Sequence, residues 1–580
     1  MPLRLVPFST PQACGCRELP LMCRPLPARH SARQVPLQLL VIWCLLSLQS
    51  RPAAKLTLTE GARVPVILSH APVAVAPHAP KPACVACQPV GVWIVETGHQ
   101  RGDDSTGVAQ AADESGFWSA IRSARQSRRE PPIPAKGPRE EAPASRAQER
   151  HFHQIAGAPE INPFFNVVDA YRISGRLDVA SLCKSIVAVT KRHDALRTML
   201  VEAPHGVIQR IVPPQAEPLR IVDLSHLPAG VREDAVEHAV TAEAEAPFSF
   251  SEDVLARFTL FGAGNEEHIL VIVVHHLVFD GWSSGILCRE IASYYEHLSA
   301  GSPNELQPVR LQFADFAEWQ REWLEQSGAE AMLDYWRGQL AGCPDGVTFP
   351  YDHPRPSTGL HAAQRHTFHL PRKLNDALSD VVQREGVTFA AVALLALQLL
   401  IHHETGSEDI AVGSSMANRN RIPTSGSIGF FTNTHLLRAQ ISGEATLRDL
   451  LKRTANILAE AVAHQDVPLA QIINVMKSED AESLPGVTHR INFICLNQPS
   501  FPLGLQGLNV EAKEWLPSRP TILTDLILKV TQEQAGVRCD IEYSADLYKG
   551  ETISALAERY ELILRKIVED VDTRACSVIG

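Results

Sequence analysis

Two observations predict an α/β fold with mixed sheets for the larger part of this chain. From about residue 144 onward, short apolar β-rich runs such as His268–Val274 alternate with longer helix-like stretches such as Ala390–His402. The chain is also long: its 580 residues, 45% of them hydrophobic and 21% charged, are enough for two large domains with sizeable cores. A small scaffold held together by disulfides is therefore excluded.

The net charge makes one broad class of function improbable. Lys and Arg number 54 against 65 Asp and Glu, which gives a net charge of −11. A general nucleic-acid-binding protein would carry a basic excess. We therefore expect no nucleic-acid partner.

The composition changes near residue 143. Nineteen of the 41 Pro and six of the 12 Cys lie before residue 144, where 16 basic and 10 acidic residues give a charge of +6. Residues 144–580 contain 38 basic and 55 acidic residues and carry −17. Frequent proline without helical or strand periodicity predicts that 1–143 is a mostly disordered N-terminal extension.

Three segments of this extension carry weak signals. Leu37–Leu48 is apolar, but it is short for a membrane span and lies far from the start for a signal peptide, so a membrane location is not expected. Cys84–Cys87 is half of a zinc motif without a second pair at suitable spacing. Residues 112–129 form either a short basic helix that docks a partner or a solvated linker.

The six later cysteines are dispersed singly, which favours a cytoplasmic enzyme with reduced thiols.

The most informative residues follow the apolar run His268–Val274. They read HHLVFDG over 275–281 and lead into a helix-like stretch. Because successive strand residues point to opposite faces, His275 and His276 cannot both face one cavity, and a shared metal is disfavoured. One imidazole is expected to act and the other to support it, the alternative being a satisfied pair of core histidines.

The residues after the histidines suit a turn that fixes an imidazole in place. Asp280 can hold the loop through an ion pair, and Gly281 allows a close approach or a positive φ. Ser283 or Ser284 can cap the helix that follows. The pattern predicts a catalytic histidine at a junction of strand, turn and helix.

HHLVFDG resembles the HHxxxDG signature of the condensation domains of nonribosomal peptide synthetases, which related acyltransferases share. Further segments resemble family motifs in the family's order: Ser145–Arg150, Arg192–Thr198, Phe313–Trp319, Tyr351–Pro356, Gly406–Arg419, Ile428–Thr434, His464–Pro468 and Ile541–Tyr548. The resemblance spans about 144–570. His151–Phe152 departs from the usual aliphatic-aromatic pair, and INFICLNQ in the 490s is more polar than usual. Neither departure is expected to touch the catalytic motif.

The resemblance implies an α/β fold of two chloramphenicol-acetyltransferase-like lobes in a V-shaped pseudo-dimer, with a tunnel between them. The lobes would span 144–315 and 316–580. Donor and acceptor carrier proteins would enter from opposite ends, each presenting a thioester on a phosphopantetheine arm, so the domain itself would bind no cofactor and no metal. An adenylation domain would act in trans or on a longer chain. The product would be an amide on the acceptor.

The resemblance also implies roles for individual residues. His276 would act as a general base or would orient the amine, with His275 in support. Asp280 would be architectural. Its expected partner is an arginine, with Arg419 preferred over two others, Arg192 and Arg197. The remaining implied residues are Gly281, whose amide would donate toward the oxyanion, Trp282, which would gate the tunnel, and Ser283 and Asn433, which would line it.

Three alternatives stay open on the sequence. The first is an acyltransferase of the same fold that uses acyl-CoA to esterify a small alcohol or a lipid. The second is a catalytically silent module that recruits carrier or tailoring proteins, because a fold does not guarantee activity. The third, an epimerase, ranks below amide formation because its usual acidic motif in the second half is not evident.

Overall fold

The computed structural model describes residues 132–578 apart from 265, 303–305, 327–328, 345, 357–360, 420, 480–489, 497–501, 516, 518–519 and 534–535. The predictions for Leu37–Leu48, Cys84–Cys87 and 112–129 lie outside the described residues. Within them, helices and strands alternate along the chain and form three sheets, as the predicted α/β class requires.

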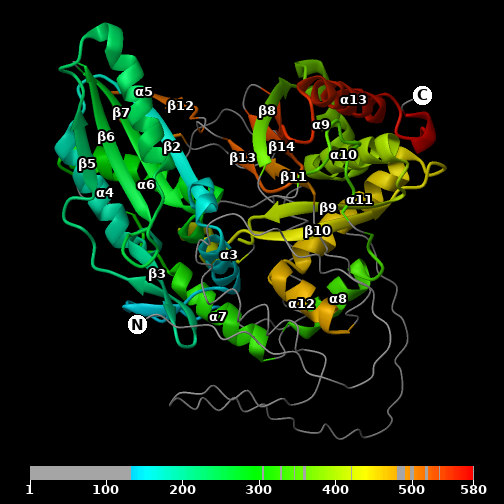
Figure 1. The fold of residues 1–580 in the computed structure, drawn as a ribbon, viewed down its shortest axis with the longest axis horizontal. Helices are drawn as coiled ribbons and strands as arrows, with labels where there is room; N and C mark the ends of the chain where they lie inside the picture. The colour runs from blue at the N-terminus through cyan, green and yellow to red at the C-terminus, as the bar shows by residue number, and fades with distance from the viewer. Residues whose placement is uncertain are drawn as a thin grey trace, which may run out of the picture. The chain divides into compact units, whose positions relative to one another are not determined.

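The first half of the described chain is organised around a five-stranded sheet (Figure 1). Its strands, in sheet order, are β12 (Asn509–Lys513), β2 (Asn166–Ser174), β7 (Glu267–His275), β6 (Ala256–Gly264) and β5 (Leu219–Asp223). The helices of this half are α3 (Arg146–Gly157), α4 (Val179–Arg192), α5 (Ala229–Glu245) and α6 (Gly281–Ala300), with 3-10 turns η1 (Pro159–Phe165), η2 (Asp194–Arg197) and η3 (His276–Val278). The central strand β7 is buried at every position from 269 to 275. The predicted strand is therefore present, and it is covered on both faces of the sheet.

A three-stranded antiparallel sheet contains the first strand of the described chain. It contains β1 (Glu141–Pro143), β4 (Gly206–Ile211) and β3 (Thr198–Ala203). The residues before β1 also contact α7 (Phe313–Glu325): Lys136 Nζ lies 3.0 Å from Glu318 Oε1, and Arg139 Nη1 lies 2.8 Å from Glu318 Oε2. The expected boundary between 143 and 144 is therefore too late, because strand pairing and ion pairs attach this proline-rich segment to the fold.

The second half is organised around a seven-stranded mixed sheet. Its strands, in sheet order, are β10 (Asn433–Gln440), β9 (Asp409–Met416), β11 (Ile491–Leu496), β14 (Leu526–Glu533), β15 (Gly536–Ser544), β8 (His361–His369) and β13 (Thr521–Ile522). The helices are α8 (Glu330–Leu340), α9 (Arg372–Glu385), α10 (Phe389–Thr405), α11 (Leu447–Ala463), α12 (Leu469–Glu479) and α13 (Gly550–Glu569), with 3-10 turns η4 (Ile422–Gly426) and η5 (Ala575–Ser577).

Helix α10 matches the predicted stretch Ala390–His402 and extends it by a residue or more at each end. Thr388 caps its start by accepting a hydrogen bond from the Ala391 amide at 3.3 Å, and Gly406 ends it in the left-handed conformation. No single helix of the described chain is long and apolar enough to cross a membrane. Taken together, α9 and α10 have the length and apolar composition of a membrane span, but the two helices are bent by 106° relative to each other.

Strand β12 crosses from the second half of the chain into the first sheet. It pairs antiparallel with β2, from Asn509 opposite Ser174 to Lys513 opposite Ala170. In Figure 1 this orange strand lies beside the cyan and green strands of the first half. The expected lobe 316–580 is therefore not self-contained, because β2 uses a strand from it to complete the sheet edge.

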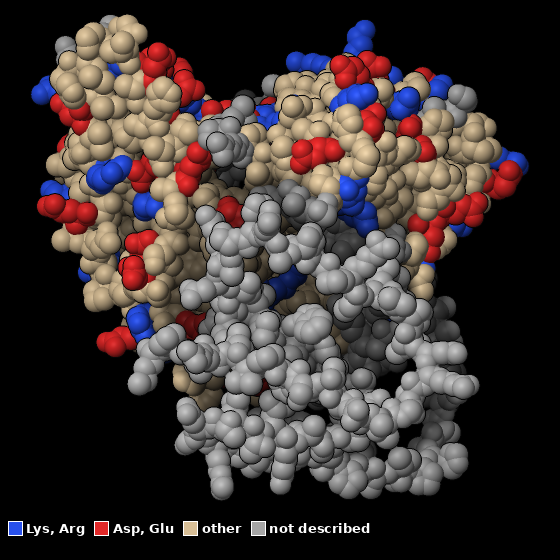
Figure 2. Space-filling view, in the orientation of Figure 1, with Lys and Arg blue, Asp and Glu red and all other residues tan. Residues whose placement is uncertain are grey.

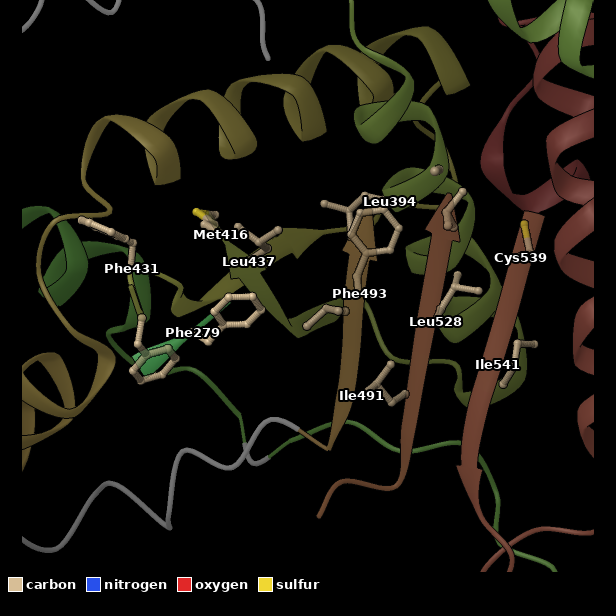
Figure 3. Close-up of a cluster of buried hydrophobic side chains, with 14 of the residues drawn as sticks. Phe279, Leu394, Met416, Phe431, Leu437, Ile491, Phe493, Leu528, Cys539 and Ile541 are labelled. Atoms are coloured by element: carbon tan, nitrogen blue, oxygen red, sulfur yellow. The ribbon is translucent and has the colours of Figure 1, made fainter. Parts of the chain in front are cut away.

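The two halves share one hydrophobic core. Figure 3 shows Phe279, from the turn after β7, among buried side chains of the second half such as Phe431 and Phe493. Gly429 lies at this junction, and a Cβ there would come within 2.3 Å of the Phe313 ring. On the face shown in Figure 2, acidic and basic side chains are interspersed without a continuous basic area.

Candidate active site

The predicted strand, turn and helix are present around the paired histidines. β7 ends at His275, η3 covers the next three residues, and α6 follows. Asp280 is the N-cap of α6, and its Oδ1 accepts a hydrogen bond from the Ser283 amide at 2.9 Å. The expectation that Ser283 or Ser284 caps this helix is therefore wrong, because the carboxylate just before the helix takes that role.

His275 is a buried support for the turn. Its ring centroid lies 5.0 Å from that of Phe250 and 5.9 Å from that of Phe248. Nδ1 accepts a hydrogen bond from the Leu277 amide at 3.2 Å. Burial lowers the pKa of His275 to about 3, so the imidazole is neutral. This geometry fits the supporting role predicted for the first histidine.

His276 is half-buried at the first residue of the turn. Its ring lies edge-on to Phe430, with centroids 5.0 Å apart and planes at 78°. Nδ1 is buried without a hydrogen-bond partner in the described part of the chain. Burial lowers the pKa of His276, and the turn backbone and the Asp280 carboxylate offset part of that effect. The neutral imidazole can accept a proton near pH 7.

Asp280 is locked by hydrogen bonds from both halves of the domain. The side chain is 1% exposed. It accepts hydrogen bonds from the Ser283 hydroxyl at 2.7 Å, from Arg419 Nη2 at 2.9 and 3.1 Å, and from the Phe431 amide at 3.2 Å. Arg419 is therefore the partner of Asp280, as preferred from the sequence.

Arg419 also contacts the segment that follows β9. Its Nη1 donates to the carbonyls of Thr424 and Ser427 at 2.7 and 2.6 Å. Its guanidinium carbon lies 4.2 Å from the ring centroid of Phe431. The segment after β9 is thereby attached to the start of α6.

The other two arginines considered for Asp280 lie elsewhere. Arg192 Nε is 3.0 Å from Glu290 Oε2. Arg197 pairs with Asp194 and donates to the Val212 carbonyl at 2.7 Å. Their expected role beside Asp280 is therefore wrong: Arg192 links α4 to α6, and Arg197 stabilises the segment that follows α4.

Gly281 lies at the first position of α6, beside open space. Its φ is not positive, and a Cβ built there would meet no atom within 4 Å. The expected positive φ is wrong. The expected close approach of another residue to Gly281 is likewise not found among the described residues. What remains is room beside the turn that contains His276.

The residues expected to gate or line the tunnel are largely structural. Trp282 Nε1 donates to the Ser425 carbonyl at 2.9 Å, so the indole is tied to the opposite half. Ser283 is fully buried in the Asp280 network, and Asn433, which is 7% exposed, donates to carbonyls of the 465–467 loop. The lining role of Ser283 and Asn433 is corrected accordingly, while the tunnel itself stays a prediction.

Two contributors were missed on the sequence. Gln148 forms a capping box with Ser145, and its Nε2 donates to the Leu277 carbonyl of the catalytic turn at 2.7 Å. The opening motif was recognised, but its contact with the turn was not. His151 packs edge-on against Phe430, with centroids 5.6 Å apart, and His276 contacts the same ring. The departure at His151 therefore lies beside the catalytic motif, contrary to expectation.

Acid should destabilise this domain through its buried neutral histidines. Burial lowers the pKa of His275 to about 3 and that of His151 and His435 to about 4. Because the unfolded chain binds these protons near pH 6.5, the free energy of unfolding should fall as pH drops toward 4. The expected slope is up to about 1.4 kcal/mol per pH unit for each histidine.

Urea denaturation of the full chain at several pH values between about 7.5 and 5 measures this slope. A His435→Phe variant keeps an aromatic ring stacked on Trp336. It should lower the slope of the unfolding free energy against pH by the contribution of one histidine. A free energy of unfolding that stays constant below pH 6.5 would contradict the prediction.

Within the described residues, no group of three or more His, Cys, Asp or Glu side chains is arranged to hold a metal ion. The candidate site therefore consists of one half-buried imidazole, a helix N-terminus and a locked ion pair. Such a site can exchange a proton and donate hydrogen bonds to a developing oxyanion.

Comparison with known proteins places this site in a family. The condensation domain pattern matches residues 138–578. One component of the linear gramicidin synthase of Brevibacillus parabrevis is 34% identical over 433 residues, which cover 74% of this chain and 8% of that protein. Phosphinothricin tripeptide synthetase PhsC of Streptomyces viridochromogenes is 30% identical, over 78% of this chain and 42% of its own length. The chain thus spans only a part of these relatives.

Solved structures with the same fold agree. The X-domain from teicoplanin biosynthesis superposes with a TM-score of 0.66 at 24% identity, covering 77% of this chain and 99% of that one. The first condensation domain of the calcium-dependent antibiotic synthetase gives 0.61 at 19% identity, over 75% and 98% of the two chains. The fold is therefore the chloramphenicol-acetyltransferase-like fold of these domains, and the chain belongs to the condensation domain family.

Proposed function

We propose that this domain forms an amide bond between an acyl or peptidyl thioester on a donor carrier protein and the amine of an aminoacyl thioester on an acceptor carrier protein. The observation that carries the proposal is the position of the half-buried His276 in the turn that leads to Gly281, beside which there is open space. The surrounding polar groups at Asp280, Ser283 and Arg419 are occupied by one another.

The chemistry needs little from the protein beyond placement and proton handling. The amine nitrogen attacks the thioester carbonyl, the C–N bond forms, and the C–S bond breaks to release the donor's phosphopantetheine thiol. Bringing the two arms together supplies several kcal/mol. His276 either takes the proton that the amine loses or orients a neutral amine by accepting its hydrogen bond.

The start of α6 would stabilise the tetrahedral oxyanion. The Gly281 amide lies in the first turn of a 20-residue helix, where backbone N–H groups are free of helical acceptors and the helix dipole favours negative charge. In the described part of the chain this amide has no protein acceptor. An oxyanion formed beside His276 would fill that position.

Reconstitution with carrier proteins tests the proposal. The full chain would be mixed with donor carriers loaded with a panel of acyl groups and acceptor carriers loaded with a panel of amino acids, and the acceptor mass would be measured. A mass gain in the wild type that the His276→Ala variant loses is the expected result. Transfer from acyl-CoA to an alcohol instead would favour the esterifying acyltransferase.

A silent recruitment module is the second candidate function. The X-domain that shares this fold has also been solved in complex with OxyB, another protein of teicoplanin biosynthesis. Against this candidate, the present chain keeps all four residues of its signature: His275, His276, Asp280 and Gly281. Failure of both transfer assays with well-folded protein would favour recruitment.

Gly281→Ala should separate activity from stability. The added methyl group meets no atom within 4 Å, so the free energy of unfolding should stay within about 0.5 kcal/mol of the wild type. The same methyl group would occupy the space proposed for the reacting groups, and amide formation should fall roughly 10- to 100-fold. Urea denaturation and the carrier assay measure the two effects. Unchanged turnover would show that the reaction takes place elsewhere.

A further inference from the structure

A carboxylate on the strand beside β7 is not used by the proposed mechanism. Asp169 lies on β2, opposite Ile272 of β7. Its Oδ2 accepts a hydrogen bond from the Ser284 hydroxyl at 2.5 Å. On the same two elements, Tyr171 Oη and Cys288 Sγ lie 3.1 Å apart. These four polar side chains join β2 to α6, which packs on this sheet (Figure 1).

Asp169 differs from the buried carboxylates of this domain because it has no cation beside it. Each buried Asp or Glu of the described chain forms an ion pair with an arginine; these residues are Asp194, Glu243, Asp280, Glu290, Asp315, Asp466, Asp525 and Asp540. Among the described residues, no Lys or Arg forms such a pair with Asp169. Burial raises the pKa of Asp169, and the hydrogen bond from Ser284 offsets part of this shift. The carboxylate therefore loses hydration without gaining a counter-charge from the described chain.

Asp169 also lies close to the open space at Gly281. Asp169 and Ser284 are both partly exposed. Ser284 follows Gly281 by three residues, so the two are neighbours on one face of α6, about 4.5 Å apart along the helix axis. On the side of β2 that faces away from β7, β12 covers only Ala170 to Ser174. The carboxylate is therefore just past the end of β12 and one helical turn from the space proposed for the reacting groups.

The same face of α6 continues along a cavity. Ala292, which follows Cys288 by one turn, lines a cavity of about 650 Å³ together with Ser293 and Leu503. Along this helix face, Ser284 and Cys288 thus lie between the cavity and Gly281.

We propose that Asp169 is a specificity-determining residue that binds an ammonium group of the substrate, carried by either the donor or the acceptor residue. The ammonium would supply the counter-charge that the buried carboxylates of the described chain obtain from arginine. Away from bulk water, such a charge-assisted contact is stronger than at the surface. The placement of the substrate beside Gly281 rests on the proposed function, whereas the binding of a cation by Asp169 does not.

Matched substrate pairs test the inference by turnover. Acceptor carriers loaded with lysine or norleucine, and donor carriers loaded with the N-acetylated forms of both, give pairs that differ by one ammonium group. A third pair on the donor carrier, norleucine and N-acetylnorleucine, tests the donor's own α-ammonium. We expect the wild type to prefer the cationic member of one pair, which identifies the source of the ammonium. Asp169→Asn keeps the size of the side chain and should lower that preference roughly 10- to 100-fold in kcat/KM.

Two controls separate specificity from net charge and from structure. Asp376→Asn removes the same charge from an exposed position of α9 and should leave the preference unchanged. A carboxyl group whose pKa is raised by folding destabilises the folded state at pH values above that pKa. Asp169→Asn should therefore unfold at an equal or higher urea concentration than the wild type at pH 7.

Three results of these assays would overturn the proposal. The first is a ratio of cationic to neutral substrate that Asp169→Asn changes by less than twofold. The second is an equal change of that ratio in Asp376→Asn. The third is a less stable Asp169→Asn protein that loses activity equally on both members of each pair, since this would assign the carboxylate to the fold.

Binding distinguishes this inference from amide formation itself. Calorimetric titration of the full chain with pantetheine amides of lysine and norleucine, and with their N-acetylated forms, requires no turnover. Tighter binding of a cationic member by the wild type, lost in Asp169→Asn, would support the inference even if no amide forms. Equal affinities of the wild type for both members of every pair, with turnover ratios also unchanged in the variant, would overturn it while leaving amide formation standing.

Discussion

Replacement of Asp280 by Ala should destabilise the folded domain by about 3–5 kcal/mol. The carboxylate is 1% exposed and is the acceptor that neutralises Arg419, which is 3% exposed. Removing it leaves a buried guanidinium without its counter-charge, and it removes the cap of α6 and an acceptor for the Phe431 amide. A loss of this size is a large fraction of the stability of a typical domain.

Urea denaturation of the full chain measures this effect. The matched control is Asp376→Ala on the exposed face of α9, which should change the free energy of unfolding by less than about 0.5 kcal/mol. A double variant, Asp280→Ala with Arg419→Met, should recover part of the loss because the unpaired charge is gone. A soluble Asp280→Ala protein of wild-type stability would show that the ion pair is not structural.

His276→Ala should lower the rate of amide formation by roughly 10²- to 10⁴-fold while leaving the fold intact. The imidazole is half-buried, and Nδ1 makes no hydrogen bond to the described residues, so little structure depends on it. Its Nε2 is the proposed acceptor for the amine proton. The loss should therefore appear in turnover rather than in unfolding.

The pH dependence gives a second test of His276. Burial lowers its pKa below 6.5, so the neutral form should persist, and the rate through this group should hold, as pH falls to 6.5. The rate should decline only as pH falls through the lowered value. His205→Ala, in an exposed turn between β3 and β4, is the matched control and should behave as wild type. Titration of the His276 ring itself above pH 6.5, followed by NMR, would contradict a buried neutral imidazole.

The central part of this site was predictable because its signals are local. The apolar run of β7, the paired histidines and the acid five residues after His275 are adjacent in sequence, and the alternation of strand side chains separates the roles of the two rings. The pairing of Asp280 with Arg419 could be proposed only from the family resemblance. The sequence around Arg419 does not indicate a partner 139 residues away.

Long-range packing could not be predicted. His151 and Phe430 are distant in sequence, and neither has a pattern that would bring it to His276. The predicted tunnel-lining roles of Ser283 and Asn433 were wrong for a related reason. Both side chains donate hydrogen bonds to backbone carbonyls that come close to them only in the folded chain. The capping role moved from serine to Asp280 because two oxygens of one carboxylate can serve the helix and the arginine together.

Strand β12 has a consequence for building hybrid synthetases from this domain. Because residues 509–513 complete the edge of the sheet that contains β7, the strand that ends at His275, an exchange made at the midpoint of the chain would pair β2 with a foreign strand. The native β12 would lose its partner β2. An uncovered sheet edge can pair with the edge of another molecule, which leads to aggregation. A hybrid should therefore take β2 and β12 from the same parent protein, even though more than 330 residues separate the two strands.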